Sequence, residues 1–241
     1  MNGFAIRTTK EILRDPLSFL FGIGFPVILL ILLTAISNNI PNDLFELEKL
    51  TPGIAVFGLS FMSLFSAQLI AKDRSSSLLD RLFTTPMTAF DYIIGYTLPL
   101  LPMALAQSII CYTVAVLLGM KVTTTIFTAL LMTIPSAIIF IGIGLLCGSV
   151  FSEKTVAGIC GALLTNLTAW LSGTWFDLEL VGGAFKATAY FLPFVHAVDI
   201  GKAALAGTYT AFFPALWWIL GYGIGFVTIA VLVFKRKMQL N

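Results

Sequence analysis

Residues 72–86, KDRSSSLLDRLFTTP, carry five charged side chains and separate two long apolar stretches. Charged residues make up only 11% of the 241 residues and hydrophobic residues 58%, whereas about a quarter of the residues in soluble domains are charged. This composition predicts a polytopic membrane protein. The remaining hydrophilic segments are too short to fold as a separate soluble domain, so we expect one membrane domain over residues 1–241.

Long apolar segments predict the membrane spans. A helix needs about 20 apolar residues to cross a hydrocarbon core of about 30 Å, and its backbone polar groups must be satisfied internally. The sequence therefore predicts an all-α fold with six transmembrane helices. They cover residues 17–37, 52–71, 92–118, 126–151, 156–172 and 213–234.

The basic residues predict the orientation of these spans. With both termini and the loops at residues 72 and 153 on one side, that side holds ten of the 14 Lys and Arg residues. The positive-inside rule makes it the cytoplasmic side. The ten are Arg7, Lys10, Arg14, Lys72, Arg74, Arg81, Lys154, Lys235, Arg236 and Lys237.

The N-terminal segment, residues 2–15, predicts an amphipathic helix that lies in the membrane interface. Arg7, Lys10 and Arg14 recur at i, i+3 and i+7 and therefore share one face. An ordinary basic flank that only sets the topology would give the same pattern, and the two interpretations are compatible. The opposite face carries Ile6, Thr9, Ile12 and Leu13.

The charged interruption itself predicts a second amphipathic helix, over residues 73–85, because Pro86 ends any helix before it. Its apolar stripe would anchor it to the membrane domain, and its polar face would point away. The alternative is a solvated loop whose apolar residues dip into lipid. The apolar stripe consists of Leu78, Leu79, Leu82 and Phe83, and the polar face includes Arg74, Asp80 and Arg81.

The segment before the last span is too long and too apolar for a simple connection. Residues 185–205 predict two short helices broken at Pro193. Non-helical backbone at membrane depth must be covered by protein, so we expect a re-entrant or interfacial hairpin. An amphipathic surface helix is the alternative.

Motifs for catalysis are absent from the sequence. It has no Gly-x-x-x-x-Gly-Lys-Ser/Thr loop, so we expect the chain to bind no ATP itself, and it has no His-Glu-x-x-His or Gly-x-Ser-x-Gly. We therefore expect no catalytic residues. His196 and Asp199 stand at i, i+3 but lack a third ligand, so no metal site is expected.

The spans themselves carry few chemical signals. No charged residue lies near the middle of a span, which disfavours an ion-coupled transporter. Gly144-x-x-x-Gly148 and Gly221-x-x-x-Gly225 match a pattern that permits close helix packing.

The order of elements resembles the permease subunits of ABC-2 type ATP-binding-cassette exporters over nearly the whole chain. The most specific match runs from Asp73-Arg74 to Thr84-Thr85-Pro86. One departure is that Ser75 and Ser76 follow Asp-Arg, where the family commonly has an acidic residue and glycine. Other matches are Arg14-Asp15-Pro16, Phe25-Pro26, Thr51-Pro52-Gly53-Ile54, Asp91-Tyr92-Ile93 and the region from Pro193 to Asp199.

The resemblance implies a complex of two six-span subunits, identical or homologous, with two separate ATPase subunits that bind ATP and magnesium. Residues 1–16 would be the elbow helix, residues 73–85 the coupling helix and residues 185–205 the outer gate. The ATPase contacts would be Asp73, Arg74, Asp80 and Arg81, and the substrate cavity would include Phe61, Phe65, Asn166 and Trp170.

Further expectations follow from the same resemblance. The protein would be a multi-pass protein of a prokaryotic inner membrane, with no cofactor of its own and no nucleic-acid partner. Its substrate would be a drug, peptide, lipid or lipid-linked glycan, because an apolar cavity fits all four. The alternatives are an ATP-independent secondary transporter or channel, and a membrane scaffold that transports nothing.

Overall fold

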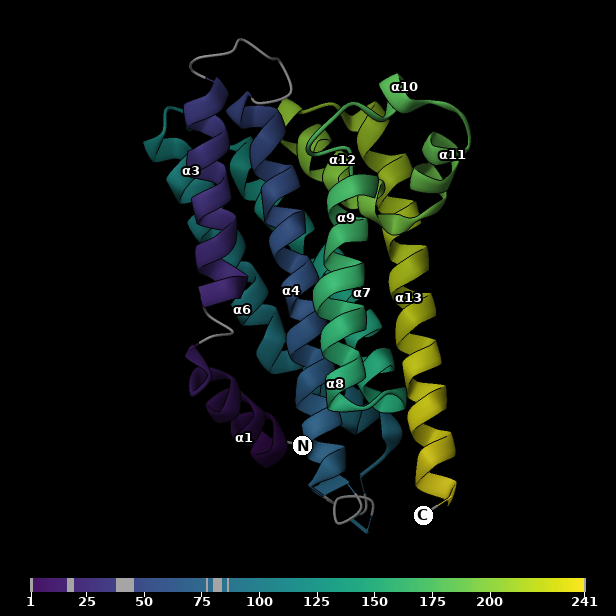
Figure 1. Ribbon diagram of the computed structural model, residues 1–241. Coiled ribbons are helices and arrows are strands. Elements are labelled where there is room, and N and C mark those ends of the chain that lie inside the picture. Colours follow the sequence, from purple (N-terminus) through teal and green to yellow (C-terminus); the bar gives the residue numbers. More distant parts are fainter. Residues whose placement is uncertain are drawn as a thin grey trace.

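The computed structural model describes residues 2–16, 20–37, 46–76, 78–79, 84–85 and 87–240. Over these ranges the chain is a bundle of helices (Figure 1). The elements are α1 (Asn2–Leu13), η1 (Leu20–Gly24), α3 (Phe25–Ser37), α4 (Leu47–Ser75), α6 (Ala89–Leu117), α7 (Thr125–Val150), α8 (Glu153–Val156), η3 (Ala157–Leu164), α9 (Thr165–Leu171), α10 (Leu178–Val181), α11 (Gly183–Phe191), α12 (Pro193–Ala206) and α13 (Tyr209–Leu240).

Five helical segments of the described chain are long and apolar enough to cross a membrane, which makes the protein a multi-pass membrane protein. They cover residues 20–37, 47–75, 89–117, 125–150 and 210–236. The predicted span 156–172 is helical but is divided into α8, the π-helix η3 and α9. The hydroxyl of Thr165 accordingly donates to the carbonyl of Cys160, five residues earlier, at 3.1 Å. A sixth span stays a prediction.

The end of α4 corrects one predicted boundary. No residue between Ala71 and Ser75 breaks a helix, and charge alone does not end one, so α4 continues to Ser75. Asp73 and Arg74 therefore lie in its last turn and do not begin a separate coupling helix. Leu78 and Leu79 are described, and Leu79 is buried. Asp80, Arg81, Leu82 and Phe83 lie outside the described residues.

Helix α4 occupies the centre of the bundle and is buried along most of its length. It packs against α3, α6, α7, α12 and η3. Its contact with α7 is the closest, because a Cβ atom at Gly144 would overlap Ser66 and the carbonyl of Ser63, and one at Gly148 would overlap Ala67. The Gly144 motif is thus confirmed as a helix-packing motif.

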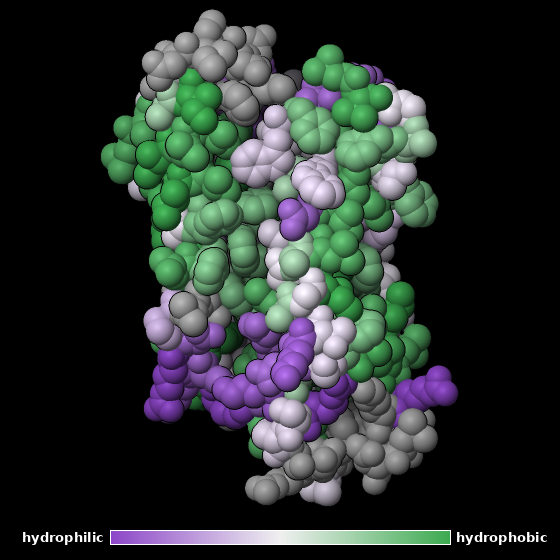
Figure 2. Space-filling model, in the orientation of Figure 1, coloured by the Kyte–Doolittle hydropathy of each residue, from purple (hydrophilic) through white to green (hydrophobic). Residues whose placement is uncertain are grey.

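The surface of the bundle matches a membrane environment. Helices α3 and α13 expose large apolar side chains such as Ile28, Trp217 and Ile224. Figure 2 shows hydrophobic residues over the middle of one face and hydrophilic residues gathered at the end where α1 lies. Such an apolar band requires a nonaqueous surrounding.

The two ends of the bundle differ. Helix α1 and the C-terminal ends of α4 and α13 lie at one end, and α10, α11 and α12 at the other (Figure 1). The break at Pro193 is confirmed, since α11 ends at Phe191 and Pro193 begins α12. Helix α12 is buried against α4, α7 and α13.

The α4–α7 contact predicts a difference between two glycines. The substitution Gly144→Ala forces the helices apart, so it lowers the free energy of unfolding by about 1–3 kcal/mol. Gly225→Ala is the control, because nothing lies within 4 Å of a Cβ atom there. Denaturant titration in detergent micelles measures both. Equal stability of the two variants would contradict the packing described here.

Candidate functional site

Helix α1 docks on α6 through aromatic contacts. Phe4 packs edge-to-face on Tyr96, with ring centroids 4.9 Å apart, and on Tyr92 at 5.9 Å. The ring of Phe4 fills the space that a side chain at position 95 would occupy, so Gly95 permits the approach. The inward stripe of α1 is therefore Phe4, Thr8 and Ile12, whereas Ile6 and Leu13 of the predicted apolar face are exposed.

A buried carboxylate joins this helix to the centre of the bundle. The Asp73 side chain is only 1% exposed. Arg7 donates to both of its oxygens, at 2.7 and 2.6 Å, and the Tyr96 hydroxyl donates to one of them at 2.8 Å. Three helices, α1, α4 and α6, thus each contribute one side chain to this contact. Asp73 was expected to contact the ATPase, but its side chain points inward to Arg7 and Tyr96.

Two further charges extend this cluster toward the surface. Glu11 accepts from Arg7 at 2.6 Å and from Lys72 at 2.9 Å. Charges therefore alternate from Lys72 through Glu11 and Arg7 to Asp73, and each is paired. The hydrogen bond to Asp73 raises the pKa of Arg7 against the opposing effect of burial. We call Arg7, Glu11, Lys72, Asp73 and Tyr96 the α1–α4–α6 junction.

Arg74 makes a second connection from the same turn of α4. Its guanidinium donates to the backbone carbonyls of Ser149 and Phe151, at the C-terminal end of α7. A cation is favourable there because the last carbonyls of a helix lack intrahelical partners and carry partial negative charge. The last turn of α4 is thus connected to α1, α6 and α7.

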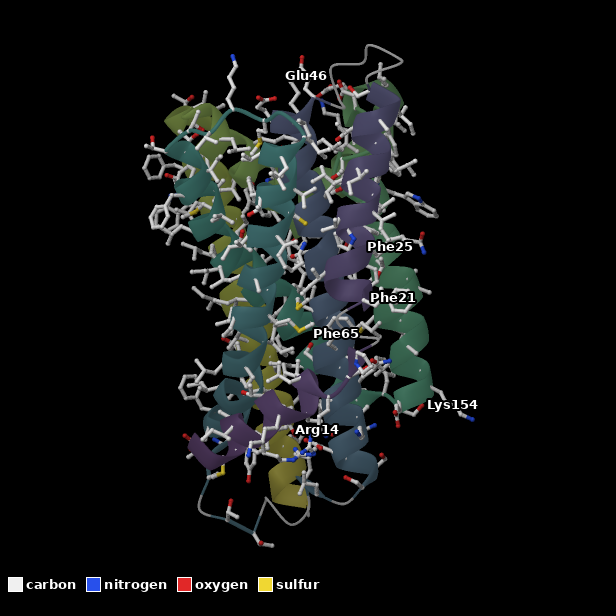
Figure 3. The ribbon with its side chains drawn as sticks, turned by 90° about the vertical axis from the view of Figure 1, so that its left-hand side faces the viewer. Arg14, Phe21, Phe25, Glu46, Phe65 and Lys154 are labelled. Atoms are coloured by element: carbon white, nitrogen blue, oxygen red, sulfur yellow. The ribbon has the colours of Figure 1, made fainter. Side chains whose placement is uncertain are left out.

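Ligand pockets in proteins have volumes of about 300–1,000 Å³. A pocket of about 950 Å³ lies beside the junction, between α1, α4 and α8. The predicted basic residues Arg7, Lys10 and Arg14 all line it, together with Phe65 and Glu153. The lining of this pocket is therefore partly charged and partly apolar. Figure 3 places Phe25, Phe21 and Phe65 in succession toward the end that carries Arg14 and Lys154.

The four predicted cavity residues have different surroundings in the single chain. Phe61 is buried among aromatic rings, with centroids 6.4 Å from Phe21, 6.0 Å from Phe25 and 5.7 Å from Phe57. Phe65 is buried against Gly22 of η1. On α9, by contrast, Trp170 is 54% exposed and Asn166 is exposed, its amide donating to the carbonyl of Ala162. A cavity that contains all four stays a prediction.

His196 and Asp199 lie at the opposite end of the bundle. The His196 ring stacks on Trp218, with centroids 4.9 Å apart, and its Nε2 atom lies 2.8 Å from the carbonyl of Tyr190. Among the residues described, no three His, Cys, Asp or Glu side chains gather closely enough to hold a metal ion.

Comparison with protein families gives one match, to the family model described as ABC-2 type transporter, over residues 4–206. The matched region contains the α1–α4–α6 junction and the segment 72–86. Comparison with curated proteins finds no match.

The junction predicts strong thermodynamic coupling between Arg7 and Asp73. In a double-mutant cycle with Arg7→Gln and Asp73→Asn, we expect a coupling energy of about 1–3 kcal/mol, because either single change leaves a buried group without its partner. Denaturant titration of the four proteins in micelles measures it.

The control cycle uses Glu179→Gln and Lys186→Gln. This ion pair also joins two segments, but its side chains are 60% and 38% exposed. Exposed pairs contribute about 0–1 kcal/mol. Equal coupling energies in the two cycles would show that Asp73 is not a buried connection.

Proposed function

Because the chain belongs to the ABC-2 type transporter family, we propose that it is the permease subunit of an ATP-driven exporter. A separate ATPase subunit binds ATP and magnesium and supplies the energy. The sequence supports this division, since it contains no phosphate-binding loop of the Walker type. The substrate is hydrophobic or amphipathic, and transport proceeds by alternating access.

The α1–α4–α6 junction is the observation that carries this proposal. An ATPase that moves the segment after Ser75 pulls on the last turn of α4. Asp73 passes that displacement to α1 through Arg7 and to α6 through Tyr96, and Arg74 passes it to the end of α7. Packed helices that share such connections move as rigid bodies. We propose that this group is the lever that opens and closes the cavity.

The ATPase docks at the end of the bundle that carries α1. Segment 73–85 keeps its predicted role as the contact region, but its residues take different roles within it. Asp73 and Arg74 are held within the subunit and transmit force, while Asp80 and Arg81 contact the ATPase. Leu79 is buried against the core, which supports the predicted apolar anchor. This end of the bundle is cytoplasmic, in agreement with the positive-inside rule.

A second permease subunit completes the cavity. Large apolar side chains are exposed at Leu163 of η3, Trp170 of α9, Phe21 of η1 and Ile28 of α3. We propose that a second copy or a homologue covers this surface. Such an arrangement brings Asn166 and Trp170 to the subunit interface, beside the α4 helix that carries Phe61.

The pocket beside the junction supports an amphipathic substrate. It combines basic side chains with the apolar Phe65 and Leu69. Charged side chains therefore contact one end of an amphipathic substrate, and apolar side chains contact the other. At the opposite end, α11 and α12 form the proposed outer gate. Helix α12 is buried against three long helices, which satisfies the requirement that re-entrant structure be covered.

Isolation of the complex tests the proposal. The tagged chain, purified in mild detergent, is expected to bring down an ATPase subunit and a bound amphipathic compound, both identified by mass spectrometry. Transport by the purified chain alone in an ion gradient would contradict the proposal and favour a secondary transporter.

Charge reversal at Arg81 tests the docking surface. We expect Arg81→Glu to weaken binding of the ATPase more than tenfold and to reduce its recovery accordingly, since interfacial like-charge contacts cost several kcal/mol and about 1.4 kcal/mol is a factor of ten. The matched control is Lys121→Glu, at the opposite end of the bundle, which leaves recovery unchanged. Unchanged recovery with Arg81→Glu would place the ATPase elsewhere.

A further inference from the structure

The glycine motif on α13 does not pack against another helix. Nothing lies within 4 Å of a Cβ atom built at Gly221 or Gly225, whereas Gly144 of the similar motif on α7 is in tight contact with α4. The expectation that the Gly221 motif mediates close packing is therefore wrong within the described chain. The two glycines instead leave a gap on the apolar surface of α13.

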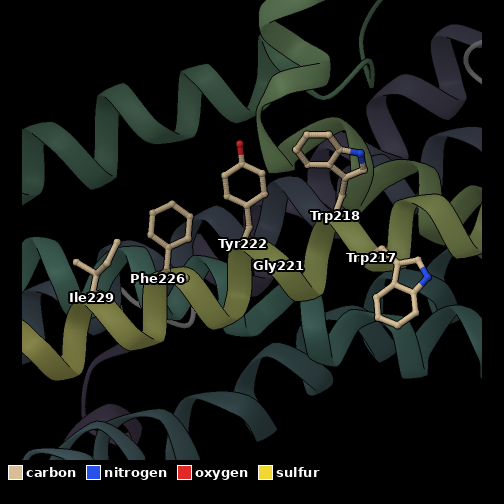
Figure 4. A pocket seen from close by; sticks show the side chains of 7 residues that line it. Trp217, Trp218, Gly221, Tyr222, Phe226 and Ile229 are labelled. Carbon is tan, nitrogen blue, oxygen red and sulfur yellow. The ribbon is translucent and has the colours of Figure 1, made fainter.

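This gap is an apolar trough of about 550 Å³. Figure 4 shows Trp218, Tyr222, Phe226 and Ile229 projecting from one side of α13, whereas the ring of Trp217, which also lines the trough, projects to the other side in this view. The rings stack along the helix, with centroids 5.9 Å apart for Trp218 and Tyr222 and 6.0 Å apart for Tyr222 and Phe226. The Tyr222 hydroxyl also donates to the carbonyl of Phe191. The walls of the trough are therefore fixed by their own contacts.

The trough lies in the middle of the α13 span. Eleven residues separate Trp218 from Ile229, which corresponds to about 16 Å along a helix. The hydrocarbon core of a bilayer is about 30 Å thick, so one leaflet contributes about 15 Å. The apolar span of α13 covers residues 210–236, so the trough is centred near the bilayer midplane. Gly221 lies within the leaflet at the α10–α12 end and Gly225 lies close to the midplane, where the end of an acyl chain from that leaflet would reach.

A polar chamber continues the trough at its outer end. This cavity has a volume of about 840 Å³, and Trp218 lines both it and the trough. Ala211 and Ala215 on the same face of α13 line it as well. Its remaining walls bring together charges of both signs, from Glu46, Glu48, Lys49, Lys121, Asp199 and Lys202.

Two of these charges are available to a ligand. Lys49 pairs with Glu46 at 2.9 Å, but Asp199 forms no ion pair within 4 Å among the described residues. Lys202, one turn further along α12, donates to the carbonyl of Gly173 at 3.4 Å and likewise forms no ion pair within 4 Å in the described part of the chain. Burial raises the pKa of Asp199 and lowers that of Lys202, so both charged forms lack full solvation. A ligand with one positive and one negative group would compensate both.

We propose that the trough and the chamber together bind one phospholipid with a zwitterionic headgroup, drawn from the leaflet at the α10–α12 end. One acyl chain lies over Gly221 and Gly225 between the aromatic rings. The headgroup enters the chamber, with its phosphate near Lys202 and its ammonium group near Asp199. Binding does not depend on the ATPase or on the transported substrate.

A helix of a second subunit fits this surface less well. Close helix pairs through Gly-x-x-x-Gly need small residues that let two backbones approach. Here Trp218, Tyr222 and Phe226 stand beside the glycines and hold a second backbone away. A flexible acyl chain fits between rings that a helix cannot pass, and the adjoining charges match a headgroup.

Native mass spectrometry of the delipidated full chain, titrated with phosphatidylethanolamine, tests the proposal. We expect one saturable lipid per chain, and affinity about tenfold weaker in the double variant Gly221→Leu/Gly225→Leu, whose side chains fill the trough. The control Thr228→Leu places a leucine at an exposed position of α13 outside the trough and leaves the affinity unchanged. Asp199→Asn/Lys202→Gln should remove the preference for phosphatidylethanolamine over diacylglycerol, which lacks the charged headgroup.

A second measurement uses the unaltered protein, so the test does not depend on the folding of a variant. Phosphatidylethanolamine with a photoreactive group on its acyl chain should label peptides from residues 217–229. Equal lipid affinity in the Gly221→Leu/Gly225→Leu variant, or labelling spread evenly over all lipid-facing helices, would overturn the proposal. Loss of dimers without loss of lipid in that variant would identify the surface as a subunit contact and would also overturn it.

Discussion

The buried carboxylate of Asp73 sets the strongest constraint on this structure. A charge removed from water is costly unless it is paired and hydrogen-bonded. Here the partners come from two other helices, Arg7 of α1 and Tyr96 of α6. Helix α1 must therefore stay docked across the end of the bundle, and its Phe4 ring and the small Gly95 make that docking sterically possible. Asp73 thus determines how α1, α4 and α6 meet.

The proposed function depends on this constraint because α4 is the central helix. Its seam with α7, built on Gly144 and Gly148, leaves little room for independent movement. A displacement applied after Ser75 consequently reaches much of the subunit through α4. The opposite end is built differently, from short helices around α12 and from the polar chamber that adjoins α13. A force applied at the α1 end of the bundle would change the shape of the α10–α12 end. The proposed lipid on α13 would stabilise the helices that connect the two ends.

Apolar run length and proline position predicted most of the helices from sequence. Five spans and the break at Pro193 follow from them, whereas the segment 156–172 contains a π-helix that periodicity does not reveal. Charge was misleading at Asp73 and Arg74, because a helix end is set by backbone and capping and not by polarity. Their inward contacts depend on Tyr96 and on carbonyls of α7, which no local pattern records. Likewise, Gly144 and Gly221 belong to the same motif, and only the tertiary neighbours distinguish them.

The role of Asp73 as a force-transmitting residue can be measured without knowing the substrate. The native cysteines are replaced, and a spin label is attached at position 186 of α11 in each of the two permease subunits. Double electron–electron resonance then measures the distance between the two labels, at the α10–α12 ends of the subunits. We predict that ATP changes this distance in the otherwise native protein, and that Asp73→Asn abolishes the change while ATPase binding and hydrolysis persist. An unaltered ATP-dependent change in the Asp73→Asn complex would contradict the account.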